Sequence, residues 1–219
     1  MTQLKNLMHE NLTERLNIKI PLIQAPMGGA VGPKLAAAVS NAGGLGTLPV
    51  WTEDLETIRS LVNETRSQTD QPFAVNLNME FLQEERLRVC LEEKVPIISF
   101  FWKDSSLLVK RAKTAGAIVM HTVSSSEEAK RAIDSGVDVL IAQGWESGGH
   151  VRGRIATMAL VPAIVDIANG IPVIAAGGIS DGRGVAAALC LGASGAWIGT
   201  RFLASEESNI HPEYLRLLL

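Results

Sequence analysis

The sequence predicts an α/β fold, built as a (β/α)8 barrel, and three observations support this fold class. Short apolar runs alternate with longer amphipathic segments along the whole chain of 219 residues. This strict alternation indicates parallel strands joined by helical crossovers. Eight such units fit a barrel, for which about 200 residues is the lower end of the usual range. A doubly wound open sheet is the competing architecture, and it usually has fewer strands.

The expected strands and helices follow one another in strict order. The strands are Ile18–Gln24, Gly44–Leu48, Phe73–Leu77, Ile97–Phe100, Ile118–His121, Val137–Ile141, Val173–Ala176 and Ala196–Ile198. The helices are Pro33–Ala42, Leu55–Thr65, Gln83–Glu92, Leu107–Ala115, Glu127–Asp134, Leu160–Ala168 and Asp181–Leu191. Glycines that suit a left-handed C-cap end five of them: Gly43, Gly116, Gly136, Gly170 and Gly192. Ser125 with Glu128 predicts a capping box at the start of the fifth helix.

The eighth unit is expected to be incomplete. About twenty residues follow Ile198, enough for a loop and a short helix. We therefore expect a barrel over residues 1–205 and a short tail over 206–219, the start of a truncated last helix or lid. The substrate-side region at the C-terminus would then be incomplete or missing. Tyr214 and the leucines after it form an apolar cluster, and a second copy of the chain could cover this face.

Composition excludes several classes of protein. Hydrophobic residues make up 47% of the chain and the formal net charge is −3, so there is no basic footprint for nucleic acid. Cys90 and Cys190 lie far apart in predicted apolar helices, which favours buried thiols over a disulfide or a metal site. The first residues lack the apolar core of a signal peptide, and no segment suits a membrane span. We expect a soluble, cytoplasmic protein without a metal.

The loop after the sixth strand is unusually long. The sixth and seventh strands start 36 residues apart, more than any other successive pair, and the excess falls in AQGWESGGHVRGRIATM. Loops that follow strands lie on the C-terminal face of a barrel, where active sites are built. His150 in this loop could remove a proton from a carbon acid or orient an anionic substrate. His121 ends the fifth strand and could line the same mouth.

Two glycine-containing strand ends predict a phosphate site. Gly177 and Gly178 end the seventh strand and open directly into a helix, and Gly199 ends the eighth strand. Glycine lets backbone N–H groups approach a phosphate closely, and a helix N-terminus adds a favourable dipole. The loops after strands seven and eight are the common phosphate site of such barrels.

Apolar and amide side chains follow other strands. Pro26 stiffens the turn after the first strand, and Met27 offers a soft apolar surface suited to an aromatic ring. Asn76 and Gln143 end the third and sixth strands with amides that donate and accept hydrogen bonds. Together with the phosphate cradle, they suit a phosphorylated, ring-bearing cofactor.

These segments resemble a known family. QAPMGG, AVNLN, AQGWESGGHVRG, LVPAIVDI and IPVIAAGGISDGRGVAAALCLGASGAWIGTRFLASEES are similar to the nitronate monooxygenases, formerly called 2-nitropropane dioxygenases, over roughly residues 15–208. The resemblance implies an FMN-containing TIM barrel. It also implies oxidation of alkyl nitronates by molecular oxygen to carbonyl compounds and nitrite, so the expected partners are oxygen and a nitronate or nitroalkane.

The resemblance assigns roles to individual residues, with His150 as the catalytic histidine. Ala25, Pro26 and Met27 would border the flavin, Asn76 and Gln143 would bond to it, Gly148 and Gly149 would lie along it, and Gly177, Gly178, Gly199 and Thr200 would hold its phosphate. Two alternatives stay open. Flavin-dependent enoyl-acyl-carrier-protein reductases share the GGH, AAGG and GTRF elements, although QAPM favours the nitronate enzymes. Family members also continue well beyond the GTRF strand, so a flavin-binding barrel with little activity is the third reading.

Overall fold

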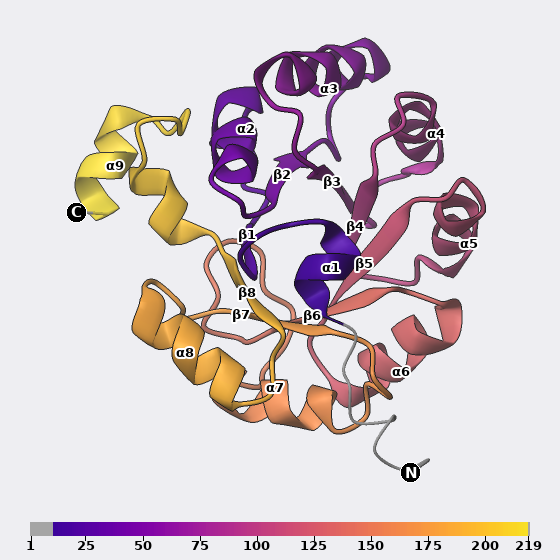
Figure 1. The fold of residues 1–219 in the computed structure, drawn as a ribbon, viewed down its shortest axis with the longest axis vertical. Helices are drawn as coiled ribbons and strands as arrows, with labels where there is room; N and C mark the ends of the chain where they lie inside the picture. The colour runs from indigo at the N-terminus through magenta and orange to yellow at the C-terminus, as the bar shows by residue number, and fades with distance from the viewer. Residues whose placement is uncertain (1–10, 219) are drawn as a thin grey trace.

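A computed structural model describes residues 11–218 of the chain, and its centre is a sheet of eight parallel strands (Figure 1). The spatial order is β1-β8-β7-β6-β5-β4-β3-β2. The strands are β1 (Leu22–Gln24), β2 (Gly46–Pro49), β3 (Phe73–Asn78), β4 (Ile97–Phe101), β5 (Ile118–Val123), β6 (Val139–Gln143), β7 (Val173–Ala176) and β8 (Gly195–Ile198). Their arrangement in a ring with helices outside confirms the predicted (β/α)8 barrel.

The barrel closes between β1 and β2, where strand pairing is weakest. A single parallel bridge, Ile23 with Leu45, joins these strands. The buried side chain of Gln24 supplements it, because Oε1 accepts from Thr47 N at 3.0 Å and Nε2 donates to Thr47 O at 3.3 Å. On its other edge β1 pairs with β8 over three residues. The closed ring excludes the competing open sheet.

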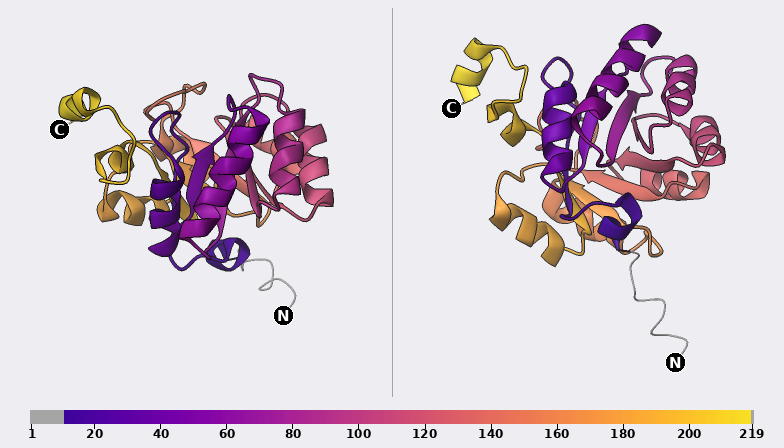
Figure 2. Two further views of the ribbon diagram at one scale, coloured as in Figure 1. Left: turned by 90° about the horizontal axis from the view of Figure 1, so that it is seen from above. Right: turned by 45° about the horizontal axis from the view of Figure 1, so that its top comes forward.

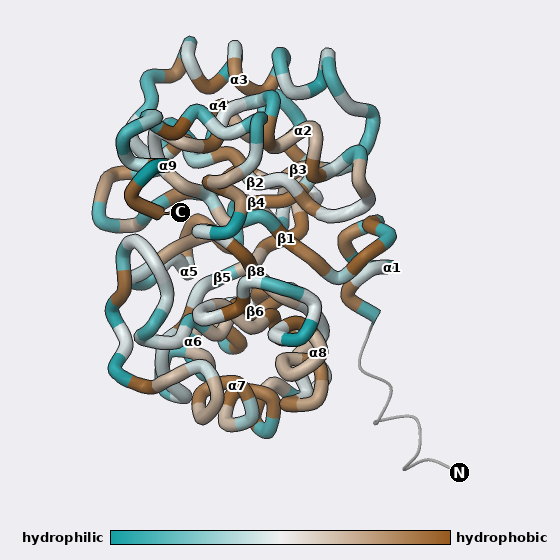
Figure 3. Tube along the Cα trace, turned by 90° about the vertical axis from the view of Figure 1, so that its left-hand side faces the viewer, coloured by the Kyte–Doolittle hydropathy of each residue, from teal (hydrophilic) through white to brown (hydrophobic). Residues whose placement is uncertain are grey.

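Helices surround the barrel on the outside (Figure 1). They are α2 (Pro33–Asn41), α3 (Leu55–Gln68), α4 (Glu84–Glu92), α5 (Ser106–Thr114), α6 (Ser126–Ser135), α7 (Thr157–Val165) and α8 (Gly182–Cys190), and a short α1 (Leu12–Leu16) precedes the first strand. Figure 3 shows α3 with hydrophilic colour on its outer turns and hydrophobic colour toward the barrel. This distribution is the amphipathic pattern of a helix packed on one side.

The core has two layers because successive strand residues point to opposite faces. Met120 of β5 belongs to the cluster inside the barrel, whereas Val119 and Val123 belong to the cluster between strands and helices. Leu12 and Leu16 of α1 complete the inner cluster from below. Figure 2 shows α1 under one end of the barrel and the longer loops at the other end. The lower end is therefore closed, and the mouth lies at the carboxyl ends of the strands.

Most predicted boundaries agree with the structure within a few residues. The first strand is shorter than predicted, because the N–H groups of Lys19 and Ile20 both donate to Gly43 O in a turn. The capping box is shifted: Ser125 Oγ accepts from Glu128 N at 3.2 Å, but the Glu128 carboxylate accepts from Ser124 N. All five predicted C-cap glycines have positive φ angles, as predicted: Gly43, Gly116, Gly136, Gly170 and Gly192.

The prediction of two buried thiols is half wrong. Cys90 is buried in α4, and desolvation raises its pKa to about 12, so it stays a thiol. Cys190 is exposed, because α8 buries only Ala188 against the barrel. No helix among residues 11–218 combines the length and the apolar character needed to cross a membrane.

After β8 the chain forms a 3-10 helix, η2 (Thr200–Ala204), and then α9 (Pro212–Leu218). None of the described residues of α9 is buried, and Leu217 is 73% exposed. Figure 1 shows α9 standing outside the ring of helices, beside α2. The predicted apolar cluster of the tail is thus exposed at Tyr214, Leu217 and Leu218, while Leu219 lies outside the described residues.

Candidate active site at the barrel mouth

The long loop between β6 and α7 is anchored at several points over the mouth. Gln143 at the end of β6 donates from Nε2 to the carbonyl of His150 at 3.1 Å. Trp145 N donates to Ile155 O at 3.0 Å, which ties the two ends of the loop together. A Cβ at Gly153 would lie 2.6 Å from Ser124 Cβ, so the loop also touches the end of β5. Gln143 therefore fixes the backbone at His150.

Glu146 holds this loop on the first turn of α7. Its carboxylate oxygens lie 3.0 and 3.2 Å from Thr157 N, which donates to them. The Thr157 hydroxyl contacts the carbonyls of Ala176 and Gly177 at 3.1 Å each. Sequence reasoning missed this residue, because Glu146 precedes Thr157 by 11 residues and no local capping pattern connects the two. The cap also explains why α7 begins at Thr157, three residues before the predicted start at Leu160.

Residues predicted to contact the flavin or its phosphate come together from three loops. A Cβ at Gly148 would lie 2.7 Å from Thr200 Oγ1, so the loops after β6 and β8 are in contact. A Cβ at Gly177 would lie 2.4 Å from Ser147 Oγ, so the loop after β7 joins them. A Cβ at either position would have to displace the hydroxyl group that it meets. The order of the strands predicted that the loops after β7 and β8 lie together, and the structure brings both against the loop after β6.

The backbone donors at this place are open. Among the described residues, no protein group accepts from the N–H groups of Gly177, Gly178 or Gly199. Accessible backbone N–H groups without a protein acceptor can donate to a phosphate. The helix N-terminus contributes less than predicted, because the Asp181 carboxylate already accepts from Arg183 N and Gly184 N at the start of α8.

Other predicted residues border the same cradle. A Cβ at Gly199 would lie 3.4 Å from Ala25 Cβ and 3.5 Å from Met27 Sδ, which places QAPM beside the phosphate loops. Pro26 lies between them and is partly exposed. Asn76 is buried inside the barrel, where its amide donates to Ser99 Oγ at 3.1 Å. Its side-chain carbonyl keeps its acceptor capacity for another donor.

His150 is exposed at the mouth and packs against a tryptophan. The rings of His150 and Trp102 meet edge to face with centroids 5.5 Å apart, and Trp102 stacks on Phe101 at 4.6 Å. Trp102 follows β4 in a left-handed conformation with φ of 63°. Trp51 after β2 and Trp145 after β6 complete a set of tryptophans on the mouth loops. Sequence reasoning missed them, although each follows a strand closely.

His121 does not line the mouth, contrary to the expectation. Because Met120 points into the barrel, its neighbour His121 points outward, between β5 and the helices. It is only 7% exposed, and desolvation lowers its pKa to about 4. Nearby Glu128 and Asp104 oppose this decrease and Arg131 adds to it. The residues before it, Ile118 to Met120, are all apolar, so no alternation in the sequence indicated which way its side chain points.

Comparison with known proteins agrees with this geometry. The family model for nitronate monooxygenase matches residues 9–84 and 78–219. The (3aS,4S,5R,7aS)-5-hydroxy-7a-methyl-1-oxo-octahydro-1H-indene-4-carboxyl-CoA dehydrogenase of Mycobacterium tuberculosis is 40% identical over 202 residues. That alignment covers 91% of this chain and 57% of the relative, so the chain spans little more than half of that protein.

Two further proteins match over nearly the whole chain. The nitronate monooxygenase of Paraburkholderia phytofirmans is 38% identical over 253 residues, covering 93% of this chain and 69% of the relative. The structure of FabK from Thermotoga maritima superposes with a TM-score of 0.90 at 42% identity, covering 94% of this chain and 66% of that one. With the family model matching far more than half of its residues, the chain belongs to the nitronate monooxygenase family.

Proposed function

We propose that this chain is an FMN-dependent oxidoreductase that oxidises alkyl nitronates with molecular oxygen to a carbonyl compound and nitrite. The observation that carries the proposal is the set of unpaired N–H groups at Gly177, Gly178 and Gly199, beside a loop that presents His150. The family match and the nitronate monooxygenase relative support the same reaction. When bound, FMN supplies the electron transfer that amino-acid side chains cannot perform.

The chain's own groups bind and orient. Gly177, Gly178, Gly199 and Thr200 would hold the phosphate, and a Cβ at Gly177 would disturb this place by colliding with Ser147 Oγ. Ala25, Pro26 and Met27 would border the ring system. Asn76 and Gln143 would offer amides, and Gly148 and Gly149 would lie along the ring's edge. Gly149 suits this role because a Cβ there would meet nothing within 4 Å, which leaves space for a flat ligand.

His150 would act on the substrate. Its backbone is fixed by Gln143 and its ring rests against Trp102, so the imidazole is presented at the mouth rather than buried. In this position it can take the α-proton of a neutral nitroalkane, or hold the nitro group of a nitronate by a hydrogen bond. A nitronate already lacks that proton, so the two roles predict different substrate dependence.

The decisive experiment uses the purified protein. We expect flavin absorbance, release of FMN on denaturation, and oxygen consumption with stoichiometric nitrite when an alkyl nitronate is added. Absence of flavin after reconstitution with FMN would contradict the cofactor assignment. Bound flavin without oxygen consumption would contradict the proposed reaction and favour the hypothesis of a flavin-binding barrel with little activity.

A second function is favoured by the relatives. The Mycobacterium tuberculosis relative, named as a carboxyl-CoA dehydrogenase, is as similar as the nitronate enzyme, and the FabK structure superposes closely. The alternative is therefore an FMN- and NAD(P)H-dependent reductase of enoyl thioesters. Oxidation of NAD(P)H that depends on an enoyl thioester, without nitrite formation from nitronates, would establish it in place of the first proposal.

A further inference from the structure

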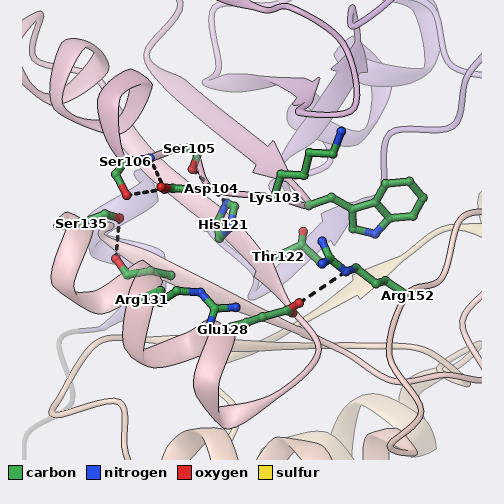
Figure 4. A pocket seen from close by; sticks show the side chains of 12 residues that line it. Lys103, Asp104, Ser105, Ser106, His121, Thr122, Glu128, Arg131, Ser135 and Arg152 are labelled. Atoms are coloured by element: carbon green, nitrogen blue, oxygen red, sulfur yellow. Dashed lines mark hydrogen bonds and ion pairs between the residues drawn. The ribbon is translucent and has the colours of Figure 1, made fainter.

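A polar pocket lies beside the barrel mouth and has no role in the flavin site (Figure 4). It has a volume of about 290 Å³, near the lower end of the range for small-molecule sites. Its walls come from β5, from the start of α5, from α6 and from Arg152 of the long loop. Figure 4 shows Arg131 and Arg152 reaching from opposite sides toward the space beside His121 and Thr122.

Two of the three cationic side chains at this pocket lie near a carboxylate, and the third forms no ion pair with the described residues. Lys103 pairs with Glu80 at 2.8 Å, outside the pocket, and Arg152 approaches Glu128 at 3.7 Å. The guanidinium of Arg131, by contrast, makes no hydrogen bond or ion pair with any residue in the described part of the chain.

The two carboxylates of the pocket are already engaged by their own segments. Asp104 accepts from Ser106 N at 2.8 Å, where α5 begins. Glu128 accepts from Ser124 N and Ser124 Oγ at 2.7 Å each, where α6 begins. Neither carboxylate forms an ion pair with Arg131, so the N–H donors of its planar guanidinium stay available to an anion.

A buried histidine faces the same space. His121 is 7% exposed, and its Nδ1 lies 3.4 Å from the Ser105 hydroxyl. No residue among 11–218 is hydrogen-bonded to its Nε2. The accessible ring nitrogen of His121 and the guanidinium of Arg131, which has no ion-pair partner in this part of the chain, together offer donors that an anion in the pocket can use.

We propose that this pocket binds a phosphate-type anion, held by the guanidinium of Arg131, with Nε2 of His121 and the side chain of Arg152 as further donors. The anion has two sources: free inorganic phosphate, or a phosphate group carried by a longer substrate. The second source rests on the alternative function, the reduction of an enoyl thioester. Trp102 lines the pocket and also contacts the His150 ring, so the two sites share a wall that a long substrate could cross.

The first test follows the imidazole signals of ¹⁵N-labelled protein by NMR during a pH titration, with and without inorganic phosphate at constant ionic strength. The charged groups that face His121 are Asp104, Glu128, Arg131 and Arg152, with Lys103 at the rim. Bound phosphate adds negative charge beside the ring and is expected to raise the pKa of His121 from about 4 by a unit or more. His121→Gln assigns the signal.

The matched variants are Arg131→Gln and Arg111→Gln. Both remove one exposed arginine charge, but Arg111 of α5 does not line the pocket. We expect Arg131→Gln to weaken phosphate binding about tenfold or more, as for other hydrogen bonds to charged groups, and Arg111→Gln to leave it unchanged. No phosphate-dependent shift at His121, or an equal response in both variants, would overturn the proposal.

The source of the phosphate is tested with coenzyme A and pantetheine, which share the thiol arm but differ in their phosphates. If coenzyme A reproduces the His121 response and pantetheine does not, the pocket receives a phosphate carried by a substrate. If only inorganic phosphate acts, it is a free-anion site. The readout needs neither flavin nor turnover, so failure of the proposed function leaves this result intact.

Discussion

At Gly177 and Gly178 the backbone has φ angles of 114° and 69°, a region that residues with a Cβ rarely adopt. A Cβ at Gly177 would collide with Ser147, whereas one at Gly178 would meet only ordinary contacts with Glu146, the nearest at 3.4 Å. A substitution at Gly177 would therefore change both steric contacts and backbone conformation, whereas a substitution at Gly178 mainly changes backbone conformation. Gly178 is the cleaner place to test the phosphate assignment.

We expect Gly178→Ala to lose most of its affinity for FMN, because the change strains the positive φ angle on which the open N–H groups depend. A residue with a Cβ in this region costs about 1–2 kcal/mol. Gly116→Ala is the matched control, since Gly116 has φ of 85° and open space around it at the end of α5, far from the mouth. FMN titration and thermal unfolding measure both variants.

If both variants lose the same unfolding free energy but only Gly178→Ala loses FMN binding, the phosphate assignment is supported. Full FMN occupancy in that variant would refute it.

The role of His150 is tested by His150→Asn, which keeps a polar side chain but removes the titratable ring. Loss of general-base assistance is expected to slow oxidation of a neutral nitroalkane about 10²–10⁴-fold. A preformed nitronate should be affected less, because no proton remains to be removed. Oxygen consumption with both forms measures the difference, and FMN content should not change.

His211→Asn is a suitable control, because His211 lies at the start of α9 and outside the mouth. An equal decrease with both substrate forms would make His150 an orienting group. Undiminished turnover with both would remove it from the mechanism.

Buried His121 makes stability depend on pH in a definite direction. Its pKa is lowered to about 4 in the fold, so between that value and the ordinary 6.5 the unfolded chain binds the extra proton. The free energy of unfolding should therefore fall as the pH decreases from about 6.5 to about 4, by up to roughly 3 kcal/mol. Above pH 6.5 the residue contributes no slope.

Denaturant unfolding across this pH range measures the effect, and His121→Gln should flatten the curve there. A variant with the same pH dependence as the parent chain would contradict the assignment. Phosphate should reduce the loss of unfolding free energy at low pH, since an anion in the pocket favours the protonated ring.

At the scale of elements, the loop between β6 and α7 acts as a strap whose position depends on one carboxylate. Glu146 accepts from Thr157 N at the start of α7 and lies beside Gly178. The helix dipole favours a negative group at this position. The strap thereby couples the start of a helix to the loops that carry the predicted flavin residues.

Glu146→Gln keeps the size of the side chain but removes its charge. We expect a loss of about 1 kcal/mol in unfolding free energy and weaker FMN retention, because the strap is held less firmly. Glu127→Gln provides the control, an acidic residue in the first turn of α6 away from the cradle. Loss of stability without any change in FMN retention would confine Glu146 to capping.

At the scale of the whole molecule, α9 is the element least integrated into the fold. It buries none of its described residues, and Figure 3 shows hydrophobic colour near its end at the surface. The segment before it is better anchored, because Asn209 N donates to Ala30 O at 2.9 Å. An exposed apolar helix of this kind favours association with another surface.

Deleting residues 211–219 spares the Asn209 anchor and removes the exposed apolar helix. We expect the deletion to decrease self-association, measured by sedimentation velocity, while FMN content stays the same. Tyr214→Ser with Leu217→Ser should have the same effect without shortening the chain. Unchanged sedimentation in both would show that this face mediates no association.

Local patterns in the sequence were sufficient for the barrel. The positive-φ glycines at helix ends and the apolar strand runs depend on short-range backbone preferences. These preferences act regardless of the tertiary structure around them. The meeting of Gly148, Gly177 and Gly199 could also be predicted, because carboxyl ends of parallel strands share one face of a barrel. These features needed only the order of elements and the chemistry of glycine.

Other features were decided by tertiary structure alone. The outward direction of His121 follows from the register of β5 against its neighbours, which no local pattern specifies. The pairing of Glu146 with Thr157 spans 11 residues of one segment, and the packing of Trp102 on His150 joins two separate loops. The exposure of Cys190 depends on how little of α8 touches the barrel. Periodicity determines which elements form, whereas the packing of one element on another determines which side chains meet.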